Sequence, residues 1–193
     1  MEPVSTNTMS CSGMCSRFLW MVALLPQMAW ASSQLTSDEA ARSAFGTCAP
    51  KKENIFLDDK KMAAIQSLSG YEMPSKLVLR YVAKCGGETD GAAYVDVHQV
   101  RSKTETLFIV VDTADKIRRI EVLNFNEPPE HMPKEKWYGL FVGQALSDEL
   151  NLKKGIALVA GSTLTARATV GASRRVLALH QVLNQSLKSG GAQ

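Results

Sequence analysis

The longest hydrophobic pattern of the chain lies near its C-terminus. Between residues 164 and 187, apolar side chains recur at helical spacing, which predicts a long helix with one face toward a core. The stripe on that face consists of Ala168, Ala172, Val176, Leu179, Leu183 and Leu187. A short apolar run over residues 156–160 precedes the helix and predicts a strand, and Gly161, Ser162 and Thr163 form the turn between the two.

Two shorter helices are predicted in the first half of the chain. One covers residues 38–45. The other covers residues 58–68, because Asp58 or Asp59 can cap its start, apolar residues recur every three positions within it, and Gly70 follows its end.

Between these helices and the C-terminal one, the pattern changes to short runs of β-branched and aromatic residues. The runs predict four strands, at residues 76–84, 94–100, 106–112 and 117–125. In the second of these strands, Val95 and Val97 share one face. A Gly-rich turn is expected over residues 85–93 and a tight turn over residues 113–116. Consecutive strands joined by short turns predict an antiparallel sheet with helices packed against it, which is an α+β fold.

The segment after the last predicted strand is rich in proline. Its prolines exclude a helix or a central strand over residues 127–133, because proline lacks the backbone donor that both structures need. Residues 134–146 then predict a short helix with Trp137 and Phe141 turned inward.

The composition is that of a folded domain and argues against several functions. The 193 residues suit one domain or two small ones, with 45% hydrophobic and 21% charged residues. The net charge of +3 is small and the basic residues are scattered, so nucleic acid is not an expected partner. No metal site is predicted, because His98, His131 and His180 form no HxH or HExxH pair, and structural roles are expected for them. No catalytic residue is predicted, because the turn around Ser162 lacks both the second glycine of a hydrolase elbow and the lysine of a P-loop.

The first 31 residues have the pattern of a cleavable signal peptide. Arg17 precedes an apolar run over residues 18–31, which ends in Ala-Trp-Ala, so Ser32 would begin the mature chain. Residues 1–13 would be an upstream extension. The alternative is an uncleaved anchor, although the run is short for a membrane span. The expected location is the periplasm or another exported compartment, with or without association with the membrane.

Cysteine usage agrees with export. Cys11 and Cys15 lie within the segment that would be removed, which leaves Cys48 and Cys85 in the mature chain. An even pair in an oxidising compartment predicts one disulfide between them. The alternative is two unrelated buried thiols.

The turn before the long helix carries candidate ligand-binding residues. The first N–H groups of a helix have no partner within it, and the positive end of the helix dipole lies there, so a phosphate can bind. Gly161 allows the backbone to approach a ligand closely, and Ser162, Thr163 and Thr165 offer hydroxyl groups. The alternative is that these residues only cap the helix.

Residues 159–179, which read VAGSTLTARATVGASRRVLAL, resemble the signature of the FMN-binding domain. This domain occurs in the small flavin-carrying subunits of the Rnf complex and of the sodium-translocating NADH:quinone reductase. In that family the last threonine of a Ser/Thr-Gly-Ala-Thr sequence forms a phosphoester with FMN, and the matching residue here is Thr163. The neighbouring positions that the resemblance implies in FMN binding are Ala160, Gly161, Ser162, Leu164 and Thr165.

A second stretch, residues 115–144, resembles the family's strand, its Glu-Thr-Pro or Glu-Pro-Pro loop, and its helix with tryptophan and phenylalanine. The resemblance implies that Glu127, Pro128 and Pro129 lie near the isoalloxazine ring of FMN. Two separate motifs in the right order are more specific than either motif alone.

The resemblance also implies an organisation of the chain. Residues 94–187 would be the FMN-binding domain, and residues 188–193 a disordered tail. Residues 32–93 would be the N-terminal part of the domain, with two short helices and the first strand, or a surface for a partner.

The function implied is that of an exported flavoprotein that carries electrons, rather than a stand-alone oxidoreductase. Its partners would be a flavin transferase and a membrane redox complex. The chain departs from the family where Ala157 replaces an aspartate and Ala160 a serine or threonine, while Ser162 adds a second hydroxyl. Covalent attachment through Thr163 is therefore left open. The alternative function is a secreted, non-enzymatic binding or structural module that keeps the fold without flavin.

Overall fold

The computed structural model describes residues 35–190, so the predicted signal peptide and residues 191–193 lie outside the described residues. The helices are α1 (Ser37–Phe45), α2 (Asp59–Ser69), α3 (Glu135–Tyr138) and α4 (Thr163–Gly190), with two short 3-10 helices, η1 (Pro129–His131) and η2 (Gly139–Phe141). The strands are β1 (Pro50–Phe56), β2 (Leu77–Cys85), β3 (Glu88–Gln99), β4 (Thr104–Val111) and β5 (Ile117–Phe125). No helix within residues 35–190 is long and apolar enough to cross a membrane.

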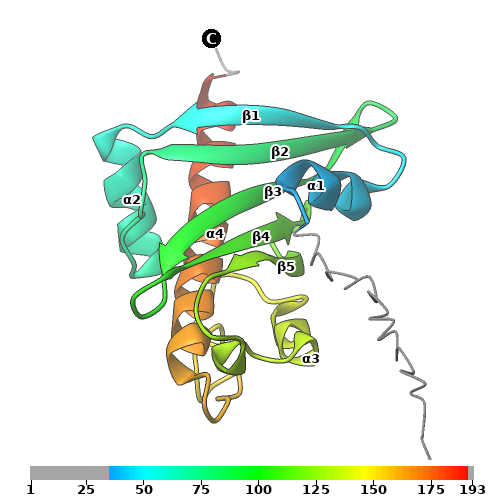
Figure 1. Ribbon diagram of the computed structural model, residues 1–193. Helices are drawn as coiled ribbons and strands as arrows, with labels where there is room; N and C mark the ends of the chain where they lie inside the picture. Colours follow the sequence, from blue (N-terminus) through cyan, green and yellow to red (C-terminus); the bar gives the residue numbers. More distant parts are fainter. Residues whose placement is uncertain (1–34, 191–193) are drawn as a thin grey trace, which may run out of the picture. The chain divides into compact units, whose positions relative to one another are not determined.

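The strands form one antiparallel sheet in the order β1-β2-β3-β4-β5, so each strand pairs with its neighbour in the sequence. The long helix α4 crosses one face of this sheet with α2 beside it, and α1 lies on the opposite face (Figure 1). The predicted α+β fold is therefore confirmed. β1 and β2, which lie before residue 93, belong to the same sheet as the three later strands.

The larger core lies between α4 and the sheet. The predicted stripe of α4 is confirmed by the burial of Ala172, Val176, Leu179 and Leu183, whereas the side chain of Leu187 lies outside the described residues. In the middle of α4, residues outside this stripe are buried as well, because the sheet covers one face of the helix and α2 packs on another. The helix also continues to Gly190, past its predicted end.

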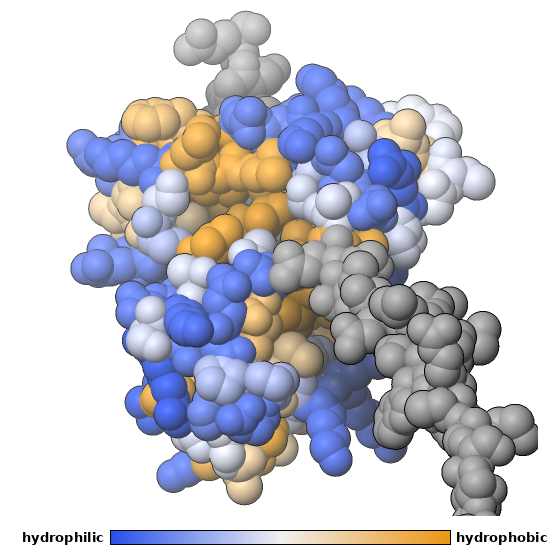
Figure 2. All heavy atoms as spheres, viewed as in Figure 1, coloured by the Kyte–Doolittle hydropathy of each residue, from blue (hydrophilic) through white to orange (hydrophobic). Residues whose placement is uncertain are grey.

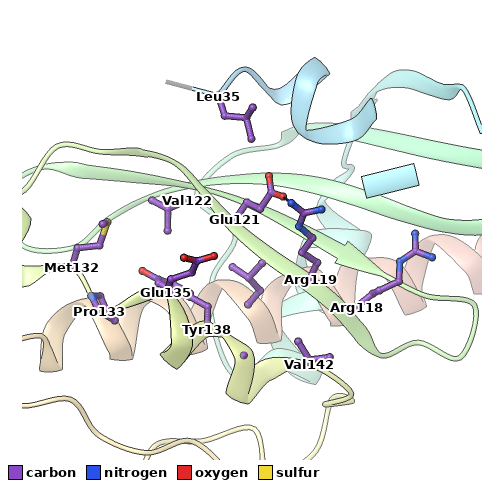
Figure 3. Close-up of a pocket in the computed structure, with 12 residues that line it drawn as sticks. Leu35, Arg118, Arg119, Glu121, Val122, Met132, Pro133, Glu135, Tyr138 and Val142 are labelled. Carbon is purple, nitrogen blue, oxygen red and sulfur yellow. Dashed lines mark ion pairs between the residues drawn. The ribbon is translucent and has the colours of Figure 1, made fainter. Parts of the chain in front are cut away.

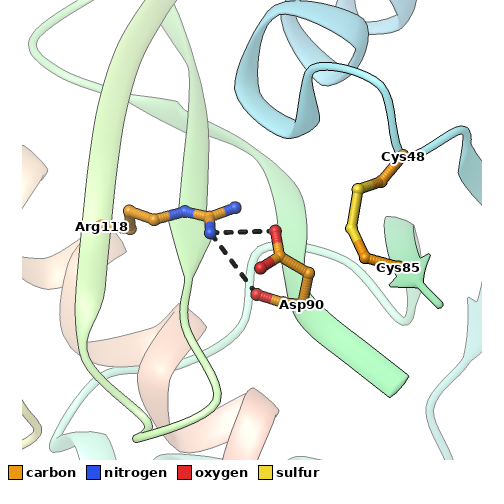
Figure 4. The surroundings of a disulfide bond; sticks show 4 residues. All are labelled: Cys48, Cys85, Asp90 and Arg118. Atoms are coloured by element: carbon orange, nitrogen blue, oxygen red, sulfur yellow. Dashed lines mark hydrogen bonds and ion pairs between the residues drawn. A yellow bond between two sulfur atoms is a disulfide. The ribbon is translucent and has the colours of Figure 1, made fainter. Parts of the chain in front are cut away.

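A smaller core on the opposite face packs α1 against the sheet. Phe45 of α1 belongs to the same cluster as Tyr81 of β2 and Phe108 of β4. The predicted disulfide between Cys48 and Cys85 is present and joins the segment after α1 to the end of β2, with the two Cα atoms 5.3 Å apart (Figure 4).

Part of the sheet face beside α1 remains uncovered. Figure 2 shows apolar surface gathered over the strands on this side of the molecule. Phe56 and Leu77, which are paired neighbours on β1 and β2, are 71% and 60% exposed. On β3, Val97 is 49% exposed. The face that Val95 and Val97 share is therefore the one opposite α4.

Two features of the N-terminal half differ from the sequence prediction. The pattern gives no strand at residues 50–56, yet β1 forms there, with exposed and half-buried residues and none fully buried. β1 forms because it pairs with β2 along its whole length, and this pairing stabilises the strand although its sequence has no alternating hydrophobic pattern. The predicted Gly-rich turn is confined to Gly86 and Gly87, whose φ angles of 60° and 95° suit a two-residue hairpin turn, so β3 begins at Glu88.

The segment between β5 and α4 is less regular than predicted. Residues 156–160 do not form a strand, because only Ile156 makes a single bridge, with Leu152. The predicted helix over residues 134–146 is limited to α3 and η2, although Trp137 and Phe141 are buried as expected. The proline segment contains the short η1, which the sequence prediction excluded, since a proline at the first position of a helical turn needs no donor.

Candidate functional site

The start of α4 has the geometry of an anion site. The Ser162 carbonyl accepts the first helical hydrogen bond, from the N–H of Ala166 at 2.9 Å, which places Ser162 at the N-cap position. Gly161 before it has a φ of 82° and open space around it. Within the described residues, the backbone N–H groups of Thr163–Thr165 have no hydrogen-bond acceptor. These free donors and the positive end of the helix dipole point toward the same place.

The three hydroxyl groups of the turn are not equivalent. Thr163 is exposed, and its Oγ1 makes only a long hydrogen bond, of 3.4 Å, to the Val159 carbonyl. Ser162 and Thr165 are 4% and 1% exposed. Thr163 therefore offers the hydroxyl that a ligand can reach most easily, and its neighbours Ala160 and Leu164 are exposed as well.

His131 joins the two sequence motifs in space. Its Nδ1 lies 3.2 Å from the Gly161 carbonyl oxygen, which requires the proton to be on Nδ1. Its own carbonyl accepts a hydrogen bond from Thr165 Oγ1 at 2.8 Å. These two hydrogen bonds hold the segment after Glu127–Pro129 against the start of α4. The sequence did not reveal the place of His131 at this site.

An aromatic cluster around Trp137 also holds the loop that precedes the turn. The indole N–H of Trp137 donates to the Ala157 carbonyl at 2.8 Å. Trp137 is buried against Tyr138 and Phe141, with its ring centroid 5.0 Å from that of Phe141. The loop before α4 is therefore fixed by a rigid aromatic cluster.

Glu127 has a different environment from the two prolines after it. Its Oε1 accepts hydrogen bonds from the backbone N–H groups of Arg101, Ser102 and Lys103, at 3.2, 2.8 and 2.8 Å. These bonds, first that from Lys103, lower the pKa of Glu127. The carboxylate thus caps the β3–β4 turn and holds it beside the loop, whereas Pro128 and Pro129 are exposed.

A buried ionic network lies between the sheet and the middle of α4. Asp96 and His98 of β3, Glu105 of β4 and Arg175 of α4 are each 7% exposed or less. His98 Nδ1 is 2.8 Å from Asp96 Oδ1, and its Nε2 is 3.1 Å from Glu105 Oε2. Burial disfavours protonation of His98, but the hydrogen bonds to the two carboxylates outweigh it and raise its pKa. When His98 is protonated, its charge and that of Arg175 balance the charges of the two carboxylates, as burial of charge requires.

The sequence did not predict this network. Its only signal is the alternation of Asp96 and His98 with valines, which is equally typical of a strand with its polar face in water. The third histidine, His180, is buried and contacts the Tyr94 hydroxyl through Nδ1 at 2.8 Å, which confirms a structural role for it. No group of three or more metal-ligating side chains occurs among the described residues.

Comparisons with known proteins identify the fold. No family model matches the chain, and no curated protein matches it. A solved structure does. The fold is similar to that of NqrC. The crystal structure of NqrC from Shewanella oneidensis matches with a TM-score of 0.55 and 17% sequence identity, over 77% of this chain and 88% of NqrC. At this identity the likeness to NqrC shows the five-stranded antiparallel sheet with its helices, and no residue roles.

Two cavities flank the site in this NqrC-like fold. A shallow one of about 220 Å³ adjoins the first turns of α4 and is lined by Leu164, Arg167, Tyr71 and His98, among others. A larger one of about 540 Å³ begins one residue beyond His131, at Met132, and runs along β5 (Figure 3). Neither is lined by Gly161, Ser162 or Thr163, but the first includes Leu164, the next residue of α4.

Proposed function

We propose that this protein is an exported flavoprotein that binds FMN at the start of α4 and carries electrons. One observation carries the proposal most. His131 brings the two sequence motifs that resemble the FMN-binding domain into direct contact, at a helix start with free N–H groups. The similarity of the fold to that of NqrC also supports the proposal.

The residues present fit the phosphate of FMN. The free N–H groups of Thr163–Thr165 would donate to its oxygens, and Gly161 leaves room beside the turn. The isoalloxazine ring, which supplies the electron-transfer chemistry when FMN is bound, would lie by Leu164 and the exposed Pro128 and Pro129. The chain itself would bind and orient the group and shield part of it from water.

The size of the adjoining cavity favours a carrier over an enzyme. Pockets that enclose a whole small-molecule ligand measure roughly 300–1,000 Å³. The cavity beside Leu164 and Arg167 measures about 220 Å³, which is below that range, so it would enclose only part of FMN. An exposed ring edge suits electron exchange with a protein partner, for which we propose a membrane redox complex.

Thr163 is the proposed attachment point. Its hydroxyl is exposed at the free N–H groups, whereas Ser162 is buried at the N-cap position. Attachment as a phosphoester would require a flavin transferase as maturation partner. Export rests on the signal-peptide pattern of residues 1–31.

An absorption spectrum of the protein purified from cells that contain a flavin transferase tests the proposal. A flavin spectrum that stays with the chain after denaturation, and is lost in Thr163→Val, would support binding and attachment. Ser162→Ala is the control and should keep the flavin, because the backbone carbonyl of residue 162, and not its hydroxyl, accepts the first helical hydrogen bond. Flavin that binds but is released on denaturation would leave the anion site without the covalent bond.

A colourless protein that also fails to bind added FMN would favour the second function, a module without flavin. One observation agrees with that function. The Glu127 carboxylate caps the β3–β4 turn, so this residue has a sufficient structural role without any ligand.

A further inference from the structure

One face of α4 borders the cavity of about 220 Å³. Arg167, Gly171 and Arg175 are spaced four residues apart, so they lie on the same face of the helix, and all three line the cavity. Gln99 and Val100, at the end of β3, line it from the sheet. No aspartate or glutamate of the described residues lines it. The cavity is therefore bordered by basic and neutral side chains.

The guanidinium of Arg175 has one nitrogen that its ion pair does not use. Nε and Nη2 donate to Asp96, whereas Nη1 has no hydrogen-bond acceptor among the described residues. Arg175 is only 7% exposed, yet Nη1 is not among the fully buried unpaired atoms, so this nitrogen is open to the cavity that Arg175 lines. Because the guanidinium is planar and Asp96 holds two of its nitrogens, the third points in a fixed direction. A buried cation thus directs free N–H groups into the cavity.

The ring of Tyr71 forms a flat wall beside this nitrogen. A Cβ atom at Gly171 would lie 3.1 Å from the Tyr71 ring and 3.5 Å from Arg175 Nη1, so glycine lets both groups approach the helix closely. Glycine within a helix is destabilising relative to alanine, and this close approach accounts for its presence. The buried Ser69 hydroxyl fixes the wall, because it donates to the Tyr71 carbonyl at 2.9 Å and accepts from the Tyr71 N–H at 3.0 Å.

The charges at the cavity favour a ligand that accepts hydrogen bonds. Arg167 is exposed and forms no ion pair within residues 35–190, so no carboxylate neutralises it. His98 also lines the cavity, but both of its ring nitrogens already contact carboxylates. Arg175 Nη1 is therefore the fixed donor for a ligand, and Arg167 adds positive charge at the rim.

We propose that this cavity is a subsite for a flat group with acceptor oxygens, which accepts hydrogen bonds from Arg175 Nη1 and lies against the Tyr71 ring. Pockets that enclose a whole small molecule measure roughly 300–1,000 Å³, so a cavity of about 220 Å³ receives one end of a larger ligand. The flat shape follows from the wall that Tyr71 forms, and the acceptor oxygens follow from the donor and the excess of basic side chains.

Two ligands offer this chemistry. One is the oxygen-bearing pyrimidine end of the FMN ring, and this source rests on the proposed function. Gly171 lies about 12 Å beyond Thr163 along the axis of α4, a distance that the ribityl chain and ring of FMN can span. The other ligand is a separate small acid, whose carboxylate would pair with Arg175.

Nitrate and flavin-free protein test the subsite without reference to FMN. Nitrate is flat and carries acceptor oxygens, and chloride at the same concentration is the control for screening of surface charge. We expect saturable NMR shifts of the Arg175 side-chain N–H groups and of the Gly171 amide with nitrate, and shifts at least fivefold smaller with chloride. Equal shifts with the two salts would indicate an adventitious ion only. That result, or no saturable shift with nitrate, would overturn the proposal.

Ala168→Leu places a larger side chain in the cavity and keeps both Arg175 and Asp96. Ala168 lines the cavity and is half-buried, and leucine is a good helix former, so the domain should still fold. We expect nitrate to bind at least fivefold more weakly to this variant. Ala63→Leu is the matched control, since Ala63 is exposed on α2 and does not line the cavity, and it should leave nitrate binding unchanged. Equal nitrate binding by the two variants would contradict the proposed subsite.

FMN then decides between the two ligands. If its ring fills the subsite, FMN-loaded protein should show no nitrate shifts at Arg175, and only Ala168→Leu should bind FMN at least fivefold more weakly. If FMN binds and nitrate still shifts Arg175, the subsite stands and its occupant is the separate acid. A wild type that binds nitrate but not FMN would refute the proposed function alone, and the subsite would again belong to the separate acid.

Discussion

Arg175 of α4 donates two hydrogen bonds to the carboxylate of Asp96 on β3, from Nε to Oδ2 at 3.2 Å and from Nη2 to Oδ1 at 2.8 Å. Both side chains are almost completely buried, and the two residues are 79 positions apart in the sequence. A bidentate ionic pair of this kind fixes the rotation of the helix relative to the sheet as well as its distance. Since the same helix begins at the proposed FMN site, the pair also determines where that helix start lies.

Removal of the Asp96 carboxylate should destabilise the domain strongly. Asp96→Ala would leave the Arg175 guanidinium buried without its acceptor and His98 with Glu105 as its one remaining carboxylate partner. Breaking such a buried pair costs roughly 3–5 kcal/mol, so the midpoint of urea unfolding should fall markedly. The matched control is Asp90→Ala, because the Asp90–Arg118 pair is partly exposed and is expected to contribute less than about 1 kcal/mol. Equal losses in the two variants would contradict the buried network.

His98 and His180 should titrate on opposite sides of the ordinary histidine pKa of 6.5. Burial opposes the charged form of both, but only His98 has two hydrogen-bonded carboxylates that outweigh burial and raise its pKa. For His180, burial dominates and lowers the pKa. An NMR titration of the ring protons measures both values in one sample. Titration of His98 below His180 would show that the network is wrong.

The same shift predicts how stability depends on pH. Because the pKa of His98 is raised by folding, its contribution is fully present below the unfolded value near 6.5 and is lost as the pH rises through the folded value. The thermal midpoint of the wild type should therefore decline on the alkaline side, and His98→Gln should remove most of that decline. His180→Gln is the control. His180 has a lowered pKa and costs stability only as the pH falls below its unfolded value, so this variant should keep the alkaline decline.

The hydrogen bond from Thr165 to His131 should matter more for FMN than for folding. Thr165→Val keeps the shape of the side chain but leaves the His131 carbonyl without its donor. Thr169→Val is a matched control, because that buried hydroxyl bonds only to the Thr165 carbonyl within α4. Each variant should lose roughly 1 kcal/mol of stability. Only Thr165→Val should weaken FMN binding, by roughly fivefold in a fluorescence titration. Equal affinities would mean that the loop does not position the flavin.

Reduction of the disulfide should lower stability without changing the fold. Cys48 and Cys85 are 37 positions apart, and closing a loop of this length stabilises by roughly 3–4 kcal/mol in the chain-entropy model. The double variant Cys48→Ser with Cys85→Ser should unfold at lower denaturant concentration and keep its far-UV circular dichroism. Thiol labelling of the denatured, unreduced wild type should find neither residue free. Labelling of both would contradict the bond.

The parts of the structure that could be predicted from the sequence depend on local interactions. α2 begins where Asp58 accepts a hydrogen bond from the Lys61 N–H at 2.8 Å and ends at Gly70 in the left-handed conformation, and both signals lie within a few residues of the helix. The turn at the start of α4 could be identified for the same reason.

The parts that could not be predicted depend on distant partners. β1 carries few apolar residues and is a strand because β2 is beside it. The contact between His131 and Gly161 joins segments 30 residues apart, and Asp96 is buried because Arg175 arrives from the last helix. Pattern alone assigns such polar residues to the surface, since only the partner makes their burial favourable.

The meander order of the sheet has a consequence for how the chain folds. Every strand pairs with the next one along the sequence, so the sheet can assemble from contacts of low sequence separation, which form quickly. The helix that covers its inner face is the last element of the chain, and its contacts span the longest loops. During synthesis the strands would therefore form before α4 covers them, and the interval in which the inner face stays exposed to water is the period of greatest risk of aggregation.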